Sequence, residues 1–209
     1  MNNNMAQIKS LYTGSKHTII SFSGAGNTLQ GTNLEFYNLK NHGYNVIWVL
    51  DETVSWFNNI DHKEIIKHIK TDKVYTIGNS MGAYNATIFS LLYNVDKVLG
   101  FAPQYSVDPT IVPWEKRWHR YTKDIKKFKY PHLKFIPWTD YTFISGHKGY
   151  ETKHMDLIPN NTNINKLVTY GSHDVATKFK ESNKLYDIIN LYFKEDKAIG
   201  QNYLDSLFT

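Results

Sequence analysis

The sequence predicts an α/β fold, a three-layer sandwich around a mostly parallel sheet. Two observations carry this prediction. Short apolar runs rich in β-branched residues recur along the chain, and segments with helical spacing of apolar residues separate them. Continuous apolar strands that alternate with helices indicate a parallel sheet covered on both faces. Because such crossovers are right-handed, a doubly wound arrangement follows.

Six runs are predicted to be strands, and each has a glycine or proline within two residues of one end. They are residues 17–23, 44–50, 73–77, 97–102, 140–144 and 166–170. In an open sheet of this kind, ligands bind beyond the carboxyl ends of the strands. The loops that follow these runs are therefore the places to look for a functional site.

Helical spacing separates the predicted strands. Tyr84, Ile88 and Leu91 follow the third run at intervals of four and seven residues, which places them on one face of a helix. Further helical segments are expected around Leu34 and Tyr37, around Ile65 and Ile69, and through Lys180, Leu185, Ile188 and Leu191. Between Pro103 and Pro137 the pattern weakens, and this stretch is expected to form a small cap over the strand ends.

Composition bounds the class of protein. The 209 residues, 41% hydrophobic and 21% charged, fit one soluble domain over residues 1–209. No stretch is apolar enough for a membrane span, and the start of the sequence lacks a secretory pattern, so a cytoplasmic location is expected. The absence of cysteine excludes disulfides, thiolate metal sites and a cysteine nucleophile. The net charge of +5 mildly favours anionic partners.

The most informative motif is Gly78-Asn79-Ser80-Met81-Gly82, which matches G-x-S-x-G. A predicted strand ends at Ile77 and a predicted helix follows at once, which is the setting that a nucleophile elbow requires. The sharp turn holds a serine with its Oγ projecting, and the flanking glycines avoid clashes with neighbouring elements. Ser80 is therefore the candidate nucleophile, and Asn79 beside it is assigned to substrate binding.

An acyl-transfer serine also needs backbone donors for an oxyanion. The N–H of Met81, at the start of the predicted helix, supplies one, and Gly24 or Ala25, in the loop after the first predicted strand, supplies the other. A dinucleotide-binding turn at Gly24-Ala25-Gly26 is disfavoured because the third glycine of that fingerprint is missing.

The base and the acid follow from chain order. In the order Ser, acid, His, the base lies after the final strand, where His173 stands three residues past Tyr170. The acid should follow the penultimate strand, which leaves Glu151 as the preferred residue and Asp156 as the alternative. The histidines lack H-E-x-x-H spacing, which disfavours a metal site. Acyl transfer by serine uses only side chains and backbone dipoles, so no cofactor is implied.

These residues resemble the α/β-hydrolase superfamily, and more narrowly small bacterial serine hydrolases associated with glycan biosynthesis. The resemblance spans about residues 17 to 190. It is carried by the elbow from Val74 to Tyr84, by Ser55-Trp56-Phe57-Asn58 after Asp51, by Phe101-Ala102-Pro103-Gln104 and by Ser172-His173-Asp174-Val175-Ala176. It implies a compact α/β-hydrolase fold and a serine esterase that uses a Ser-His-acid triad. Glu151 stands where the family usually has aspartate.

Two features remain open at this stage. A run of lysines and arginines over residues 116–134, interleaved with aromatic residues, is expected to be the solvated face of an amphipathic cap helix. It could also bind an anionic glycan or phosphate, while nucleic acid is disfavoured because no nucleic-acid-binding motif is present. Trp56 and Phe57 follow the second strand and are equally consistent with a substrate-binding wall and with core filling.

The predicted function is cleavage of an acyl ester or thioester through an acyl-enzyme on Ser80, with an acylated glycan among the substrates considered. Transfer of the acyl group to an alcohol uses the same residues, so it stays open. So does a non-catalytic glycan- or protein-binding module, because fold alone does not imply function. The sequence makes no prediction of oligomeric state.

Overall fold

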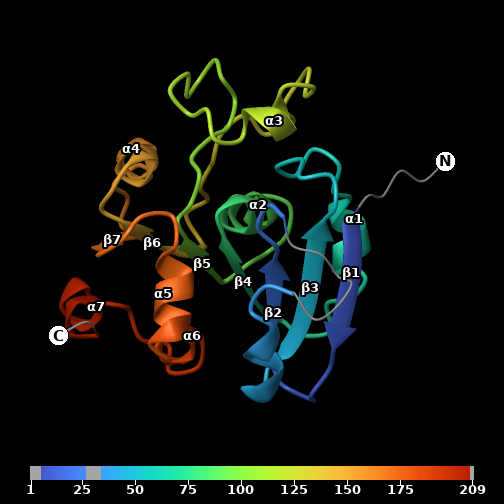
Figure 1. Cartoon of the computed structure of the whole chain (residues 1–209). Helices are drawn as coiled ribbons and strands as arrows, with labels where there is room; N and C mark the ends of the chain where they lie inside the picture. The colour runs from blue at the N-terminus through green and yellow to red at the C-terminus, as the bar shows by residue number, and fades with distance from the viewer. Residues whose placement is uncertain (1–5, 27–33, 208–209) are drawn as a thin grey trace.

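The computed structural model describes residues 6–26 and 34–207, which form one seven-stranded sheet between two helical layers (Figure 1). The strand order is β1-β3-β2-β4-β5-β6-β7. The strands are β1 (Ala6–Leu11), β2 (His17–Phe22), β3 (Asn45–Asp51), β4 (Lys73–Asn79), β5 (Lys97–Phe101), β6 (Asp140–Gly146) and β7 (Ile164–Thr169). All neighbours pair in parallel except β1, which is antiparallel to β3. The predicted fold class is confirmed.

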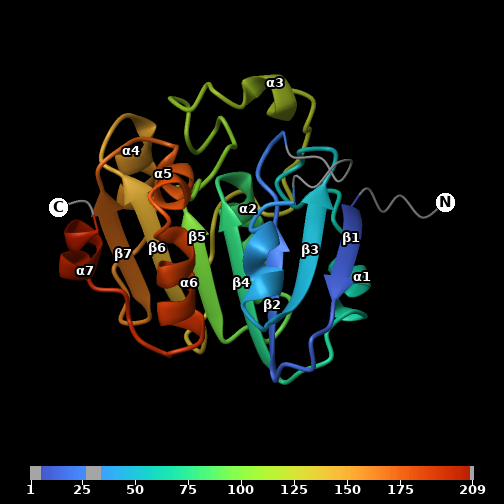
Figure 2. The ribbon, with the colours of Figure 1, turned by 60° about the horizontal axis from the view of Figure 1, so that its bottom comes forward.

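Helices cover both faces of the sheet. They are the 3-10 helix η1 (Tyr37–Asn41) and α1 (His62–Ile66), α2 (Met81–Ser90), α3 (His119–Thr122), α4 (Tyr150–Leu157), α5 (Val175–Glu181), α6 (Leu185–Phe193) and α7 (Gln201–Ser206). Figure 2 shows α5 and α6 in front of the sheet and α1 and α2 behind it. Two apolar cores result, one beneath η1, α5, α6 and α7, the other beneath α1, α2 and α4.

The edge strand β1 is an element that the apolar-run criterion misses. Its burial alternates between half-buried and exposed along its length, because one face of the strand packs against the core beneath α1 and the other faces water. Ile8 therefore stands between polar neighbours, and no continuous apolar run marks the strand. Its register is nevertheless regular, with Ile8 opposite Val49 on β3.

Two helix predictions need correction. The segment predicted around Leu34 and Tyr37 forms only a 3-10 turn, which Phe36 enters with a left-handed backbone (φ 54°). The segment predicted through Lys180, Leu185, Ile188 and Leu191 is two helices, α5 and α6. The break lies at Asn183, whose φ is 59°. A left-handed residue cannot continue a right-handed helix, so the chain turns there.

The chain between β5 and β6 passes over the carboxyl ends of the parallel strands. Figure 2 shows α3 and the adjoining loop above the arrowheads of the sheet. The expected amphipathic helix through the basic residues of this segment is wrong, because α3 has only four residues. The lysines of the run and Arg120 are exposed, whereas Arg117 is half-buried. We refer to residues 103–139 below as the cap segment.

Two backbone approaches position the elbow at the centre of the sheet. A Cβ on Gly82 would lie 2.2 Å from the carbonyl oxygen of Phe22, and one on Gly78 would lie 2.0 Å from the carbonyl carbon of Gly82. Helix α2 therefore packs against β2 and β4 more closely than any side chain would allow. Within residues 6–26 and 34–207, no helix combines the length and apolarity that a membrane span requires.

The close approach of α2 to the sheet predicts the effect of one methyl group. We expect Gly82→Ala to lower the free energy of unfolding by about 3 kcal/mol, because backbone atoms must move to admit the new Cβ. Gly200→Ala is the control, since no heavy atom lies within 4 Å of a Cβ at that position. It should cost less than about 1 kcal/mol. Urea denaturation of the two variants measures both values, and equal losses would contradict this account.

Candidate active site

Ser80 lies in the turn between β4 and α2, and its backbone has an unusual conformation. Its φ of 57° and ψ of −121° are unfavourable for a residue with a side chain. The N–H of Ser80 donates to the carbonyl of Phe101 on the neighbouring strand, at 2.9 Å. This bond and the tight packing of α2 hold the strained turn in place. Ser80 is 4% exposed.

His173 reaches Ser80 from the loop that follows β7. Its Nε2 lies 2.8 Å from Ser80 Oγ. The approach depends on Gly146 at the end of β6, because a Cβ there would lie 2.3 Å from the carbonyl oxygen of Ser172. Asp174, the next residue, accepts hydrogen bonds from Ser172 and lies 3.6 Å from the ammonium of Lys178.

Glu151 meets the other nitrogen of the same imidazole. It stands in the first turn of α4, and its Oε2 lies 3.1 Å from His173 Nδ1. With Nδ1–H donating to the carboxylate, Nε2 is left as the acceptor for the Ser80 hydroxyl. Asp156, the alternative acid, is exposed further along α4. The structure thus brings Ser80, His173 and Glu151 into one hydrogen-bonded chain.

The carboxylate of Glu151 is buried, with 1% of its side chain exposed, and has a hydrogen-bonding neighbour at each oxygen. Arg117 of the cap segment contacts its Oε1 while His173 contacts Oε2. Burial raises the pKa of Glu151, but the hydrogen bonds and charges of His173 and Arg117 outweigh it, so the pKa lies below its ordinary value. Glu151 is therefore held ionised.

Arg117 bridges Glu151 to a second buried carboxylate. Its guanidinium forms hydrogen bonds to both oxygens of Glu115, at 2.6 Å from Nη2 to Oε2 and 3.1 Å from Nε to each oxygen. Glu115 in turn lies 3.0 Å from Nε2 of His154. The backbone N–H of Tyr105 donates to Nδ1 of His154, so Nε2 carries the proton that Glu115 accepts. We call Arg117, Glu115 and His154 the support network.

Sequence reasoning missed the support network. The basic run marks Arg117 as one cation among many, and no local pattern distinguishes the one that turns inward. Burial raises the pKa of Glu115, but hydrogen bonds from His154 and Arg117 and the charge of Arg117 lower it to about 2. The side chain of Glu115 has no exposed surface, so its charge is compensated within the protein by Arg117 and not by solvent.

Aromatic residues enclose the imidazole on the cap side. The ring of Trp118 lies 5.4 Å from that of His173, and Trp56 lies 6.1 Å from Trp118. Trp56 donates its indole N–H to Gln104 at 2.6 Å. Trp56 and Phe57 are 0% and 1% exposed. Of the two readings left open by the sequence, core filling describes them, and Trp56 supports the cap.

The candidate oxyanion donors are backbone N–H groups at the start of α2 and in the loop after β2. Met81 is the first residue of α2, so its N–H has no acceptor within the helix. The N–H of Gly24 donates to the carboxylate of Glu35 at 2.5 Å. Because that donor is engaged by an anion, Ala25, which is half-buried, is the better of the two residues predicted in this loop.

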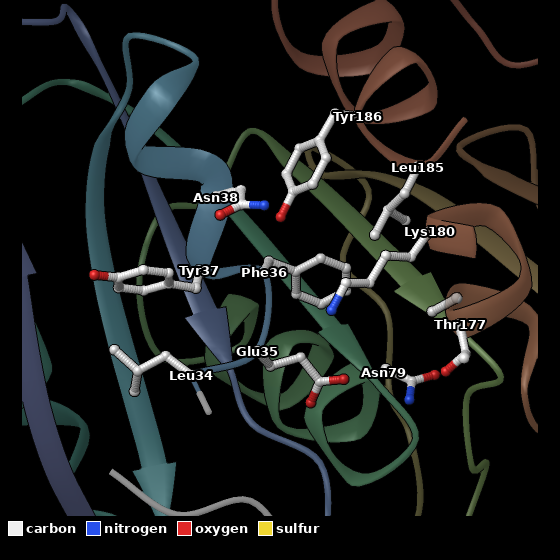
Figure 3. A pocket seen from close by; sticks show the side chains of 11 residues that line it. Leu34, Glu35, Phe36, Tyr37, Asn38, Asn79, Thr177, Lys180, Leu185 and Tyr186 are labelled. Carbon is white, nitrogen blue, oxygen red and sulfur yellow. The ribbon is translucent and has the colours of Figure 1, made fainter. Parts of the chain in front are cut away.

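A cavity of about 500 Å³ lies beside the elbow (Figure 3). Asn79 forms part of its wall, facing residues of η1, α5 and α6. The Oδ1 of Asn79 is buried without a hydrogen-bond partner in the described part of the chain. Among residues 6–26 and 34–207, no group of three or more His, Asp or Glu side chains is arranged to hold a metal ion.

Comparisons with known proteins bear on the fold. No protein-family model matches the sequence, and no curated protein matches it. Among solved structures, the capsule O-acetyltransferase of Neisseria meningitidis serogroup A is similar over 92% of this chain and 90% of its own, with a TM-score of 0.65 and 18% identity. A second structure of that acetyltransferase, in complex with CoA, has a TM-score of 0.64 over 92% and 91%, also at 18% identity.

Solved structures of hydrolases are similar to this chain over most of its length as well. An α/β superfamily hydrolase from Oenococcus oeni matches 91% of this chain and 96% of its own, with a TM-score of 0.60 and 17% identity. An esterase of Pyrococcus furiosus matches 86% and 82%, with a TM-score of 0.57 and 18% identity. At these identities the likeness is one of fold, and the chain has the compact fold of the α/β hydrolases.

Proposed function

We propose that this protein is a serine acyl hydrolase that forms an acyl-enzyme on Ser80. One observation carries the proposal. Ser80 Oγ, the His173 imidazole and the Glu151 carboxylate form a continuous chain, with contacts of 2.8 and 3.1 Å, on a strained turn at the start of a helix. A nucleophile, a base and an orienting acid in this order are what acyl transfer by serine requires.

In the first half-reaction, Ser80 Oγ attacks the carbonyl carbon of an acyl ester or thioester, and its proton passes to Nε2 of His173. The ionised Glu151 stabilises the imidazolium through Nδ1–H. The N–H groups of Met81 and Ala25 stabilise the oxyanion of the tetrahedral intermediate. When the bond to the leaving group breaks, Nε2 returns the proton to it and the acyl group stays on Ser80.

The second half-reaction repeats these steps with water. His173 takes a proton from the water as its oxygen attacks the acyl carbonyl, and the proton then returns to Ser80 Oγ when the carboxylic acid leaves. An alcohol in place of water would give acyl transfer with the same residues. The chain needs no other group to balance the reaction.

Transfer to an alcohol is the second candidate, and two observations favour it. The N. meningitidis relative in fold is an O-acetyltransferase, one structure of which holds CoA, so an acyl thioester is a plausible donor. In addition, Ser80 is 4% exposed and Trp118 packs on His173, which restricts water at the site. A non-catalytic binding module is the weaker alternative, because it gives no reason for a 2.8 Å contact between His173 and Ser80.

The first test is removal of the nucleophile. We expect Ser80→Ala to lower kcat for p-nitrophenyl acetate and for O-acetylated sugars by about 10⁴-fold or more, since the covalent route is lost. The variant should also fail to react with a fluorophosphonate probe that labels the wild type. Ser182→Ala, an exposed serine at the end of α5, is the matched control. Equal rates for Ser80→Ala and the wild type would remove the basis for the proposal.

Competing acceptors separate hydrolysis from transfer. With acetyl-CoA or p-nitrophenyl acetate as donor, product analysis in the presence of a hexose measures acetylated sugar against free acetate. If the enzyme is a transferase, acetylated sugar should be the main product even at hexose concentrations too low for the hexose to compete with water in the uncatalysed reaction. Free acetate alone would assign the enzyme to hydrolysis.

The second test identifies the acid. We expect Glu151→Gln to lower kcat by about 10³- to 10⁴-fold with little change in KM, because an amide cannot stabilise the imidazolium. Asp156→Asn makes the same chemical change on the exposed side of the same helix and should keep kcat within about twofold. Steady-state kinetics on one ester measures both variants. A larger loss in Asp156→Asn would reverse the assignment.

The third test concerns Arg117, which we propose as a positioning residue for Glu151. Arg117→Met leaves two buried carboxylates without their cation, so the free energy of unfolding should fall by about 3 kcal/mol at pH 7. This loss lies at the low end of what breaking a buried ion pair costs, because 28% of the Arg117 side chain is exposed to solvent. Arg120→Met, an exposed cation in the same segment, should cost less than about 0.5 kcal/mol.

The effect of Arg117→Met should depend on pH in a defined direction. The lowered pKa of Glu115, about 2, contributes stability that is fully present above the ordinary carboxylate range and is lost as pH falls toward 2. The difference between the wild type and Arg117→Met should therefore be largest near pH 7 and shrink between about pH 4.5 and 2. Urea denaturation at pH 7 and pH 3 measures it. A difference independent of pH would contradict the role of the ion pairs.

A further inference from the structure

The cavity beside the elbow is built from the two segments that carry the candidate catalytic residues. Asn79 is the residue before Ser80, and Thr177 lies four residues after His173, one turn along the chain into α5. The opposite wall is formed by Leu34 to Asn38, and the start of α6 closes one end. The volume, about 500 Å³, is within the range of sites that hold small ligands.

Polar groups of four chemical types gather in this cavity. Figure 3 shows that the side chains of Glu35, Asn79, Thr177 and Lys180 point toward one another from three segments of the chain. They present a carboxylate, an amide, a hydroxyl and an ammonium group. On the other side of Phe36, the side chains of Asn38 and Tyr186 add a second amide and a phenol. Such a set can both donate and accept hydrogen bonds around one ligand.

The floor of the cavity is apolar. Leu34, Phe36, Ala176 and Leu185 are all buried beneath the polar side chains. The ring of Phe36 is placed by a strained backbone with φ 54° and packs on Phe101 at 5.8 Å. A flat aromatic floor under a polar rim suits a ligand with one apolar face and many hydroxyl groups.

Two observations connect the cavity to the reaction. The Oδ1 of Asn79 is a buried acceptor without a partner in the described chain, and a ligand hydroxyl could satisfy it. Glu35, which lines the cavity, also accepts the N–H of Gly24 in the loop that carries Ala25. A ligand that contacts Glu35 and Asn79 would thus touch the residue before Ser80 and the carboxylate that binds the N–H of Gly24, although Ser80, Met81 and Ala25 do not themselves line the cavity.

We propose that this cavity is a carbohydrate subsite, which holds the sugar ring that carries the acyl ester or accepts the acyl group. This proposal rests on the proposed function and gives it a substrate class. Among the lining residues that the structure describes, Lys180 supplies one ammonium and Glu35 one carboxylate, so the site fits an uncharged sugar ring better than a polyphosphate. The carboxylate, amide, hydroxyl and ammonium groups that face the cavity also make it less suitable for an acyl chain, which would leave them without hydrogen-bond partners.

Binding without chemistry tests the subsite directly. The probe is a panel of methyl hexopyranosides, measured by saturation-transfer NMR with the full chain, and their mono-O-acetyl esters, measured with Ser80→Ala to prevent turnover. We expect saturable binding of at least one probe. Thr177→Val and Lys180→Met should each weaken it about fivefold or more, the effect of one lost hydrogen bond. Both side chains are exposed, so these variants are expected to fold.

Kinetics supplies the second measurement and the control. For Thr177→Val and Lys180→Met, the ratio of kcat/KM for an acetylated hexoside to that for p-nitrophenyl acetate should fall about fivefold or more, mainly through KM for the sugar ester. Lys194→Met removes an exposed lysine at the end of α6, outside the cavity, and should leave the ratio unchanged.

The outcomes separate this proposal from the one on which it rests. Absence of saccharide binding, or binding and ratios equal in the wild type and the two cavity variants, would overturn the carbohydrate subsite even if Ser80→Ala is inactive. Hydrolysis that persists in Ser80→Ala would overturn the acyl-enzyme while the NMR result still decides the subsite. Binding that Lys180→Met and Thr177→Val weaken would support the subsite in either case.

Discussion

The placement of one arginine side chain determines how the rest of this site is held. Arg117 lies between Glu151, which orients His173, and Glu115, which has no exposed side-chain surface. Two buried carboxylates in the absence of a cation would repel each other and would each lose hydration. The cap segment can therefore leave the sheet only if both anions take up protons or find water. The position of the cap and the ionised state of Glu151 are thus properties of the same ion pairs.

A second constraint acts from the sheet. Ser80 occupies a strained conformation, which persists because its N–H is bound to Phe101 and because Gly82 lets α2 approach β2. The loop of His173 approaches β6 at Gly146, where a side chain would collide with it. Backbone contacts therefore position the elbow and the loop of His173, while side chains of the cap contact the acid, through Arg117, and the imidazole, through Trp118. A substitution in the cap should alter the pH dependence of the site before it alters the elbow.

The sequence predicts the sheet and the elbow better than it predicts the ion pairs of the cap segment. Apolar runs with a glycine or proline near one end identify the six parallel strands, β2 to β7, and the strand, turn and helix around Ser80 identify the elbow, because each pattern is local. Chain order points to His173 and leaves Glu151 preferred over Asp156 as the acid. The inward orientation of Arg117 could not be predicted from the basic run. It depends on two carboxylates, Glu115 nearby in the chain and Glu151 on α4, which only the fold brings together. The edge strand β1 is missed because only one of its faces is covered, so polar and apolar residues alternate and no continuous apolar run marks it.

The side-chain positions show where the excess positive charge of the sequence lies. Most cations of the cap segment are exposed, and Arg117 is neutralised by two carboxylates, so the excess charge belongs to the surface. The cavity beside Ser80 contains one ammonium and one carboxylate among amide and hydroxyl groups. An anionic ligand would gain little there from a lone lysine beside a glutamate. If the proposed subsite holds a neutral sugar ring, its selectivity comes from hydrogen-bond geometry, whereas the surface lysines act on the approach of charged molecules.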